Sequence, residues 1–115
     1  YSSTDLKAAT PTITKLGNEG VILSRYYTEP DCTPARSTIL SGRYPITSGM
    51  SHSIVDLDSP WGLPTSHKLV SEQMSAAGYQ THLYGKWDIG HHDKAYWPTE
   101  RGFDSYFGLL VKTYT

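Results

Sequence analysis

The stretch VILSRYYTEPDCTPARSTIL, residues 21–40, decides the expected fold. Residues 21–27 are β-branched and aromatic and follow a glycine, which predicts a buried strand. After a turn-rich loop, residues 34–40 have the composition of a helix, with Pro34 in its first turn and Gly42 as its stop. A strand, a loop and a helix in this order predict a layer of an α/β fold.

Upstream of this stretch, the sequence predicts one more helix. The Thr-Pro pair at residues 10–11 is typical of a helix start, and Gly17 or Gly20 would end the helix. Its apolar stripe would consist of Ile13 and Leu16, with Leu6 as a further candidate.

Downstream, residues 45–64 are rich in Ser, Gly, Pro and Asp and predict a long irregular connection. Residues 66–77 then predict a helix that ends at Gly78, and residues 79–84 predict a strand that Gly85 breaks. The inward residues of that helix would be Leu69, Val70 and Met74. The order helix, strand, helix, helix, strand predicts an α/β layer with a parallel sheet.

Size and composition limit the possible classes of protein. The 115 residues suffice for one domain, but hydrophobic residues are only 37% of the chain and nine of them are Tyr, so we expect a thin core. A net charge of −1 provides no basic face for nucleic acid. No apolar run is long enough for a membrane span, and no targeting segment is recognisable. The single Cys has no internal disulfide partner.

Two loops follow the predicted strands, and both carry chemically active side chains. They are residues 29–36 and 85–92, and the carboxyl ends of parallel strands meet at one sheet edge, where ligands bind. Cys32 would lie just ahead of a helix, where amide donors, the helix dipole and Arg36 attract an anion. The alternative is a buried structural Cys with a solvent-facing Arg. For Lys86, the corresponding alternatives are an anion ligand and a solvated lysine.

The strings around these residues resemble the two signatures of the sulfatase family. CTPARSTILSGR, residues 32–43, resembles the first signature, with Ser41 where the family usually has Thr. GYQTHLYGKWDIG, residues 78–90, resembles the second. RYYTEPDCTPAR, TERGFD and YFG resemble the arylsulfatase B group in particular. The resemblance covers the chain from about residue 10 to about residue 109.

The resemblance implies a fold and an activity. Residues 1–115 would be an N-terminal part, incomplete at both ends, of an alkaline-phosphatase-like sulfatase domain with a mostly parallel sheet flanked by helices. The complete protein would be a sulfuric ester hydrolase, an arylsulfatase or an N-acetylgalactosamine-4-sulfatase-like enzyme. In the family, the formylglycine-generating enzyme oxidises the equivalent of Cys32 to formylglycine. The hydrated aldehyde attacks sulfur with one hydroxyl and expels sulfate when the other loses its proton.

The resemblance also assigns roles to individual residues. Arg36 would stabilise the hydrated aldehyde, Lys86 would bind sulfate oxygens, and calcium would polarise the ester, with modified Cys32 as one metal ligand. Arg43, at the far end of the helix, is expected to be structural. The family's acidic metal cluster lies before and after this stretch of sequence, so we expect the chain alone to be metal-free and inactive.

One position departs from the family pattern. Asp88 stands where the family has a His that contacts the sulfate or the leaving group. We therefore assign Asp88, with Lys86, to the substrate-binding group, where a carboxylate would repel the sulfate. His91, His92 and Asp93 follow closely, and a solvated loop is the preferred interpretation over a metal site.

By the same resemblance, the substrate would be a sulfated glycosaminoglycan ahead of small aryl sulfates, and the location would be the lysosome or the secretory pathway. For three tryptophans, packing in the core or at an interface is preferred over sugar or aryl binding, namely Trp61, Trp87 and Trp97. His52, His67 and His82 are expected to be structural or exposed. Two alternatives remain: a catalytically silent homologue that binds sulfated glycans, motivated by Asp88, and a Cys-dependent phosphatase, for which the spacing from Cys32 to Arg36 is too short.

Overall fold

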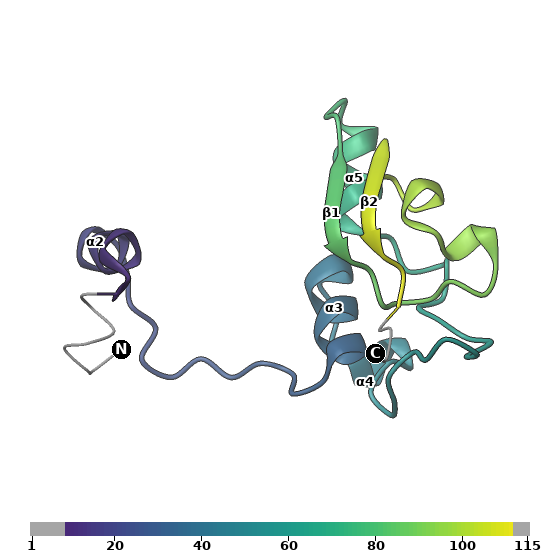
Figure 1. Ribbon diagram of the computed structural model, residues 1–115, viewed down its shortest axis with the longest axis horizontal. Coiled ribbons are helices and arrows are strands. Elements are labelled where there is room, and N and C mark those ends of the chain that lie inside the picture. Colours follow the sequence, from purple (N-terminus) through teal and green to yellow (C-terminus); the bar gives the residue numbers. More distant parts are fainter. Residues whose placement is uncertain (1–8, 112–115) are drawn as a thin grey trace.

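The computed structural model describes residues 9–111. Helix α2, Pro11–Glu19, stands apart from the other elements, and an extended segment, residues 20–30, joins it to them (Figure 1). No helix among residues 9–111 is long and apolar enough to cross a bilayer. The remaining elements are the helices α3 Cys32–Ser41, α4 Pro45–Ser48 and α5 Val70–Ala76, the strands β1 His82–Lys86 and β2 Ser105–Leu109, and the 3₁₀ helices η1 Lys94–Tyr96 and η2 Pro98–Glu100.

The sheet is parallel, as the sequence predicts, and it pairs β1 with β2. Gly85 lies opposite Gly108 in this register. Hydrogen bonding continues past β1, where the amides of Trp87 and Asp88 donate at 2.8 and 2.9 Å to carbonyls at the end of β2 and just beyond it. The prediction that Gly85 breaks the strand is wrong, because pairing with β2 carries β1 through Lys86.

The predicted strand at residues 21–27 does not form. Val21 is 86% exposed and Tyr27 is 88% exposed. A strand needs a neighbouring backbone to pair with, and no other part of residues 9–111 pairs with this segment. The second strand of the sheet is instead β2, which the sequence did not predict.

Helices α2 and α3 confirm two predicted helices, with one change at a functional position. Gly20 follows α2, whose apolar stripe is exposed, and Leu6 lies outside the described residues. Helix α3 begins at Cys32, so this residue lies in the first turn instead of ahead of it. The reason is that Asp31 already closes the turn, because its carbonyl accepts from the Ala35 amide at 3.0 Å.

Helix α5 is shorter than the predicted helix at residues 66–77. Residues before it form a turn, and the Glu72 carboxylate accepts from the Leu69 amide at 2.6 Å to begin the helix there. Within α5 the buried residue is Ser71, whose hydroxyl donates to the Arg101 carbonyl. Leu69 is buried as predicted, whereas Val70 and Met74 are exposed and were wrongly assigned to the core. Residues 45–64 are irregular apart from the single turn of α4.

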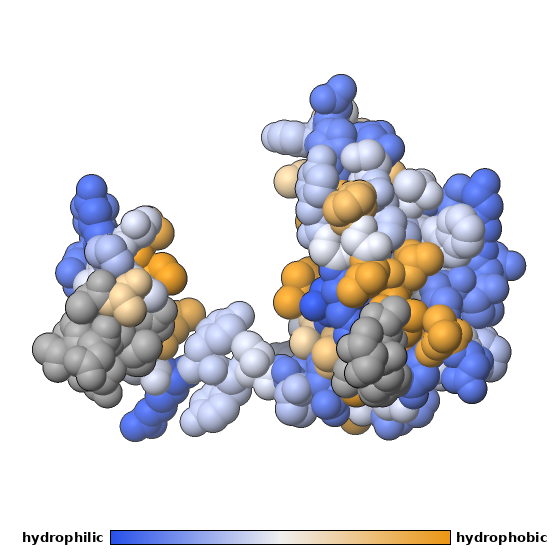
Figure 2. All heavy atoms as spheres, in the orientation of Figure 1, coloured by the Kyte–Doolittle hydropathy of each residue, from blue (hydrophilic) through white to orange (hydrophobic). Residues whose placement is uncertain are grey.

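A small core lies between the sheet and the helices. Its buried apolar residues are Met50, Val55, Leu63, Leu69, Trp87, Ile89 and Val111. Buried Arg101 links the segments around this core. It donates to the carbonyls of Leu63 and His67 and lies 3.5 Å from the Glu72 carboxylate. Many other apolar side chains are on the surface, and Figure 2 shows hydrophobic patches in the middle of the face it presents.

Candidate functional site

The first turn of α3 contacts the residues that follow β1. Thr33, which is fully buried, lies 3.0 Å from the Asp88 carbonyl and 3.2 Å from Asp88 Oδ2 through its hydroxyl. The same hydroxyl accepts from the Val55 amide at 2.9 Å. Thr33 therefore joins three segments that are far apart in the sequence. Because it stands at a variable place within C-x-P-x-R, no sequence signal identified this role.

Arg36 makes a second link between the same two segments. One of its guanidinium nitrogens donates to the Lys86 carbonyl at 2.5 Å, at the last residue of β1. Tyr106 of β2 is close to this contact, and its hydroxyl donates to the Gly85 carbonyl at 3.3 Å. Burial raises the pKa of the Tyr106 phenol, and the nearby Arg36 charge partly opposes that rise. The phenol therefore remains a neutral donor around neutral pH.

Lys86 and Asp88 form an ion pair at the centre of this contact. The Lys86 ammonium lies 3.1 Å from Asp88 Oδ2, with side-chain exposures of 18% for the lysine and 0% for the aspartate. The other carboxylate oxygen, Oδ1, is buried and has no hydrogen-bond partner among residues 9–111. The partly accessible group is thus the cation, and the carboxylate lies behind it.

Asp88 also has an unusual backbone conformation. Its φ of 64° lies in the left-handed region, which is unfavourable for most residues and in which Asn, Asp and His are enriched. The Asp88 amide donates to Leu110 and its carbonyl accepts from Thr33, so both neighbours hold this conformation. The family's His and the present Asp both suit this backbone.

Cys32 lies beside Thr33 in the first turn of α3 and is a free, half-buried thiol. The positive end of the helix dipole and the unpaired amides of the first turn favour an anion at this place. The structure therefore brings the turn that contains Cys32 and Arg36 against Lys86 and Asp88. The exposed Arg43 follows the opposite end of α3.

The other candidate residues lie in the loop after the site and make contacts that hold this loop. The His91 ring contacts the Leu57 carbonyl at 3.0 Å, the His92 ring packs on Tyr96, and the Asp93 carboxylate accepts from the Ala95 amide. The buried Trp87 ring edge donates to the carbonyls of residues 90 and 96. The burial of Trp87 matches its predicted packing role, and the exposure of His92 and Asp93 matches the predicted solvated loop. Among residues 9–111, no group of three or more His, Cys, Asp or Glu side chains is arranged to hold a metal.

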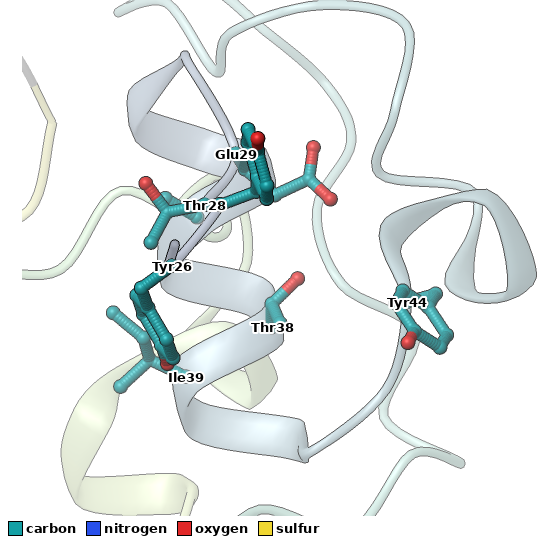
Figure 3. A pocket seen from close by; sticks show the side chains of 8 residues that line it. Tyr26, Thr28, Glu29, Thr38, Ile39 and Tyr44 are labelled. Atoms are coloured by element: carbon teal, nitrogen blue, oxygen red, sulfur yellow. The ribbon is translucent and has the colours of Figure 1, made fainter. Parts of the chain in front are cut away.

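A surface hollow of about 550 Å³ lies on α3, away from these residues. Residues 26–29 form one side of it, and Ala35, Thr38, Ile39 and Tyr44 form the rest. Figure 3 shows the side chains of Tyr26 and Thr28 over the helix and Tyr44 apart from them. None of the predicted site residues lines this hollow, so it is separate from the candidate site.

Comparisons with known proteins identify the family of this chain. The sulfatase family profile matches residues 2–114. The mouse (Mus musculus) arylsulfatase J is 42% identical over 111 residues, which cover 96% of this chain and 18% of the relative. The chain therefore belongs to the sulfatase family, and it spans about a fifth of the length of the arylsulfatases that it matches.

Two solved structures show the same fold. A crystal structure of Ps i-CgsB in complex with k-i-k-neocarrahexaose has a TM-score of 0.80 and 34% identity, and covers 90% of this chain and 23% of that one. The PsFucS1 sulfatase from Pseudoalteromonas sp. has a TM-score of 0.72 and 38% identity, with 90% and 21% covered. The α/β architecture of this chain is that of a part of a sulfatase.

Proposed function

We propose that the complete protein hydrolyses sulfate esters and that Cys32, after conversion to formylglycine, provides the nucleophile. The observation that supports this most strongly is the hydrogen bond of Arg36, about one turn after Cys32 in α3, to the Lys86 carbonyl, within a chain of the sulfatase family. The string C-x-P-x-R is complete from Cys32 to Arg36. Formylglycine at position 32 would supply a hydrated aldehyde that attacks sulfur and then releases sulfate.

The neighbouring residues would bind and orient the sulfate group. Charge in the reacting sulfuryl group lies on its peripheral oxygens, so fixed cations stabilise it. Lys86 offers an ammonium that is still partly exposed. Arg36 donates one hydrogen bond to the Lys86 carbonyl, and its guanidinium has further donors for the group at position 32. Lys86 is linked to the positive end of α3, because its partner Asp88 Oδ2 accepts from Thr33 in the first turn.

Calcium, which the resemblance implies, does not fit the described residues alone. A calcium ion takes six to eight oxygen ligands, and residues 9–111 contain no cluster of three or more acidic, Cys or His side chains. In our proposal the remaining ligands belong to parts of the complete protein outside these residues, so the chain by itself is inactive.

The proposed substrate is a sulfated glycan, with simple aryl sulfates as a second class. The support is the similarity to Ps i-CgsB, whose crystal structure contains k-i-k-neocarrahexaose. The arylsulfatase relatives support the second class. We also propose the lysosome or the secretory pathway as the location, and the formylglycine-generating enzyme as the partner that modifies Cys32.

Replacement of Lys86 by Ala should test the sulfate site. We expect kcat/KM of the complete protein for an aryl sulfate to fall by about 100-fold to 1,000-fold, because a fixed charge on the transition state is lost. Lys94 offers a matched control, since its ammonium also pairs with a carboxylate, that of Glu100, but its side chain is 73% exposed. Lys94→Ala should leave turnover unchanged. Equal activity of the two variants would remove Lys86 from the site.

The second candidate function is a silent sulfatase homologue that binds sulfated glycans without hydrolysis. The 3.1 Å pair of Lys86 with Asp88 favours it, because the carboxylate neutralises an anion ligand. Asp88→His would restore the family residue on a backbone that accepts it. A large gain of aryl sulfate turnover in this variant of the complete protein would support the silent form, and unchanged or lower turnover would oppose it.

A further inference from the structure

We propose that Asp88 is a positioning residue, which fixes the ammonium of Lys86 for sulfate binding and is itself held by Thr33. This inference rests on the proposed role of Lys86 as a sulfate ligand. It gives Asp88 a task other than direct contact with the substrate. The exposures separate these tasks, since the Asp88 side chain is 0% exposed and Lys86 retains 18%. A sulfate group that reaches this surface meets the ammonium first.

Burial of the lysine requires a counter-charge. An ammonium that loses most of its water is unstable unless a carboxylate or several acceptors replace that water. Asp88 Oδ2 supplies this replacement at 3.1 Å. Without the carboxylate, the ammonium would turn toward solvent to recover its hydration, and this movement removes it from the position in which it binds an anion.

The pair does not block Lys86. An ammonium has three N–H donors, and Asp88 Oδ2 is its ion-pair partner in the structure. Because no other residue of the described range 9–111 contacts this ammonium, two donors remain for sulfate oxygens. The carboxylate therefore orients the cation and leaves it able to bind an anion, which distinguishes a positioning role from neutralisation.

Thr33 contacts the same carboxylate oxygen that pairs with Lys86. Its hydroxyl proton is shared between the Asp88 carbonyl and Oδ2, and its oxygen accepts from the Val55 amide. The contact fixes both the backbone and the carboxylate of Asp88. Because Thr33 adjoins Cys32 in α3, the chain from Thr33 through Asp88 to Lys86 also sets the ammonium relative to position 32.

The decisive experiment measures the binding of inorganic sulfate to the complete protein by titration calorimetry. Asp88→Asn keeps the shape and suits the left-handed backbone but removes the charge. Positioning predicts that sulfate affinity falls by at least about tenfold. Coulomb's law alone predicts that sulfate affinity rises, because the variant loses a negative charge beside an anion site. Unchanged or tighter binding would overturn the proposal.

Two control sets complete this experiment. Asp104→Asn changes a carboxylate that, like that of Asp88, accepts from a threonine hydroxyl, but that pairs with no lysine among residues 9–111. This variant should leave sulfate binding intact. If Asp88→Asn fails to fold by circular dichroism, the Thr33 variants decide. Thr33→Val should weaken sulfate binding, and Thr33→Ser, which keeps the hydroxyl, should restore it. Equal weakening by Val and Ser would contradict positioning through the hydroxyl.

Turnover of an aryl sulfate by the unmodified complete protein separates this inference from the proposed function. Sulfate binding that depends on Asp88, without any turnover, would reject hydrolysis and retain the positioning role. Turnover with sulfate binding that is insensitive to Asp88 would retain hydrolysis and reject that role. Absence of sulfate binding in the unmodified protein would contradict Lys86 as a ligand and the inference with it.

Discussion

Replacement of Cys32 by Ala in the complete protein is expected to lower sulfate ester turnover by more than about 1,000-fold, because the variant has no nucleophile. Cys32 occupies the first turn of α3, and the next residue, Thr33, contacts the residues after β1. The measurement is the initial rate with an aryl sulfate under saturating calcium. Arg43→Ala is the matched control, since this exposed residue follows the far end of α3, and its rate should stay unchanged.

Cys32→Ser distinguishes the aldehyde from an ordinary nucleophile. A serine hydroxyl can attack sulfur, but it lacks the second hydroxyl that expels sulfate, so a stable sulfated enzyme is expected. Intact-protein mass spectrometry should then find at most one sulfate per molecule and no continuing turnover. Full activity of either Cys32 variant would contradict the proposed chemistry.

Replacement of Gly102 by Ala is expected to destabilise the protein by at least about 3 kcal/mol, because strain and steric overlap add together. The φ of Gly102 is +83°, and an added Cβ would lie 2.4 Å from the Glu72 amide nitrogen. This obstacle is the backbone of α5, which has no rotamer with which to move aside. A lower midpoint of thermal unfolding and a lower soluble yield are the expected observations.

Gly78 provides the matched control for this prediction. Its φ of +85° is almost the same, but no atom lies within 4 Å of the position that a Cβ would take. Gly78→Ala should therefore cost only the conformational term, about 1 kcal/mol. Similar unfolding midpoints for the two variants would mean that α5 and residue 102 are not in the contact described above.

The sequence predicts the helices and a parallel sheet, but it identifies only one of the two strands in that sheet. Pro34 favours the start of α3 and Gly42 favours its end, because each acts on its own backbone conformation. Such local preferences can be read from the sequence. Residues 21–27 have a strand composition, yet pairing depends on a neighbour that composition does not identify. Tyr106 and Phe107 of β2 favour a strand, but two residues are too short a run to predict one.

For the candidate site, the sequence predicts that residues 29–36 meet residues 85–92, but for a wrong reason. The strand expected ahead of residues 29–36 does not form, and helix α3 makes the contact instead. Arg36 and Lys86 were named from their motifs, and the structure places the Arg36 guanidinium on the Lys86 backbone. Thr33 was missed, because a hydroxyl residue near a helix start is commonplace. The left-handed φ of Asp88 and the burial of its carboxylate beside Lys86 were also beyond prediction.

The most direct test of the central claim is peptide mass spectrometry of position 32 in protein made by cells that modify other sulfatases. We predict that the peptide containing Cys32 carries an aldehyde in place of the thiol and reacts with a hydrazide reagent. An unmodified thiol throughout the protein population, in cells whose other sulfatases are modified, would contradict the account.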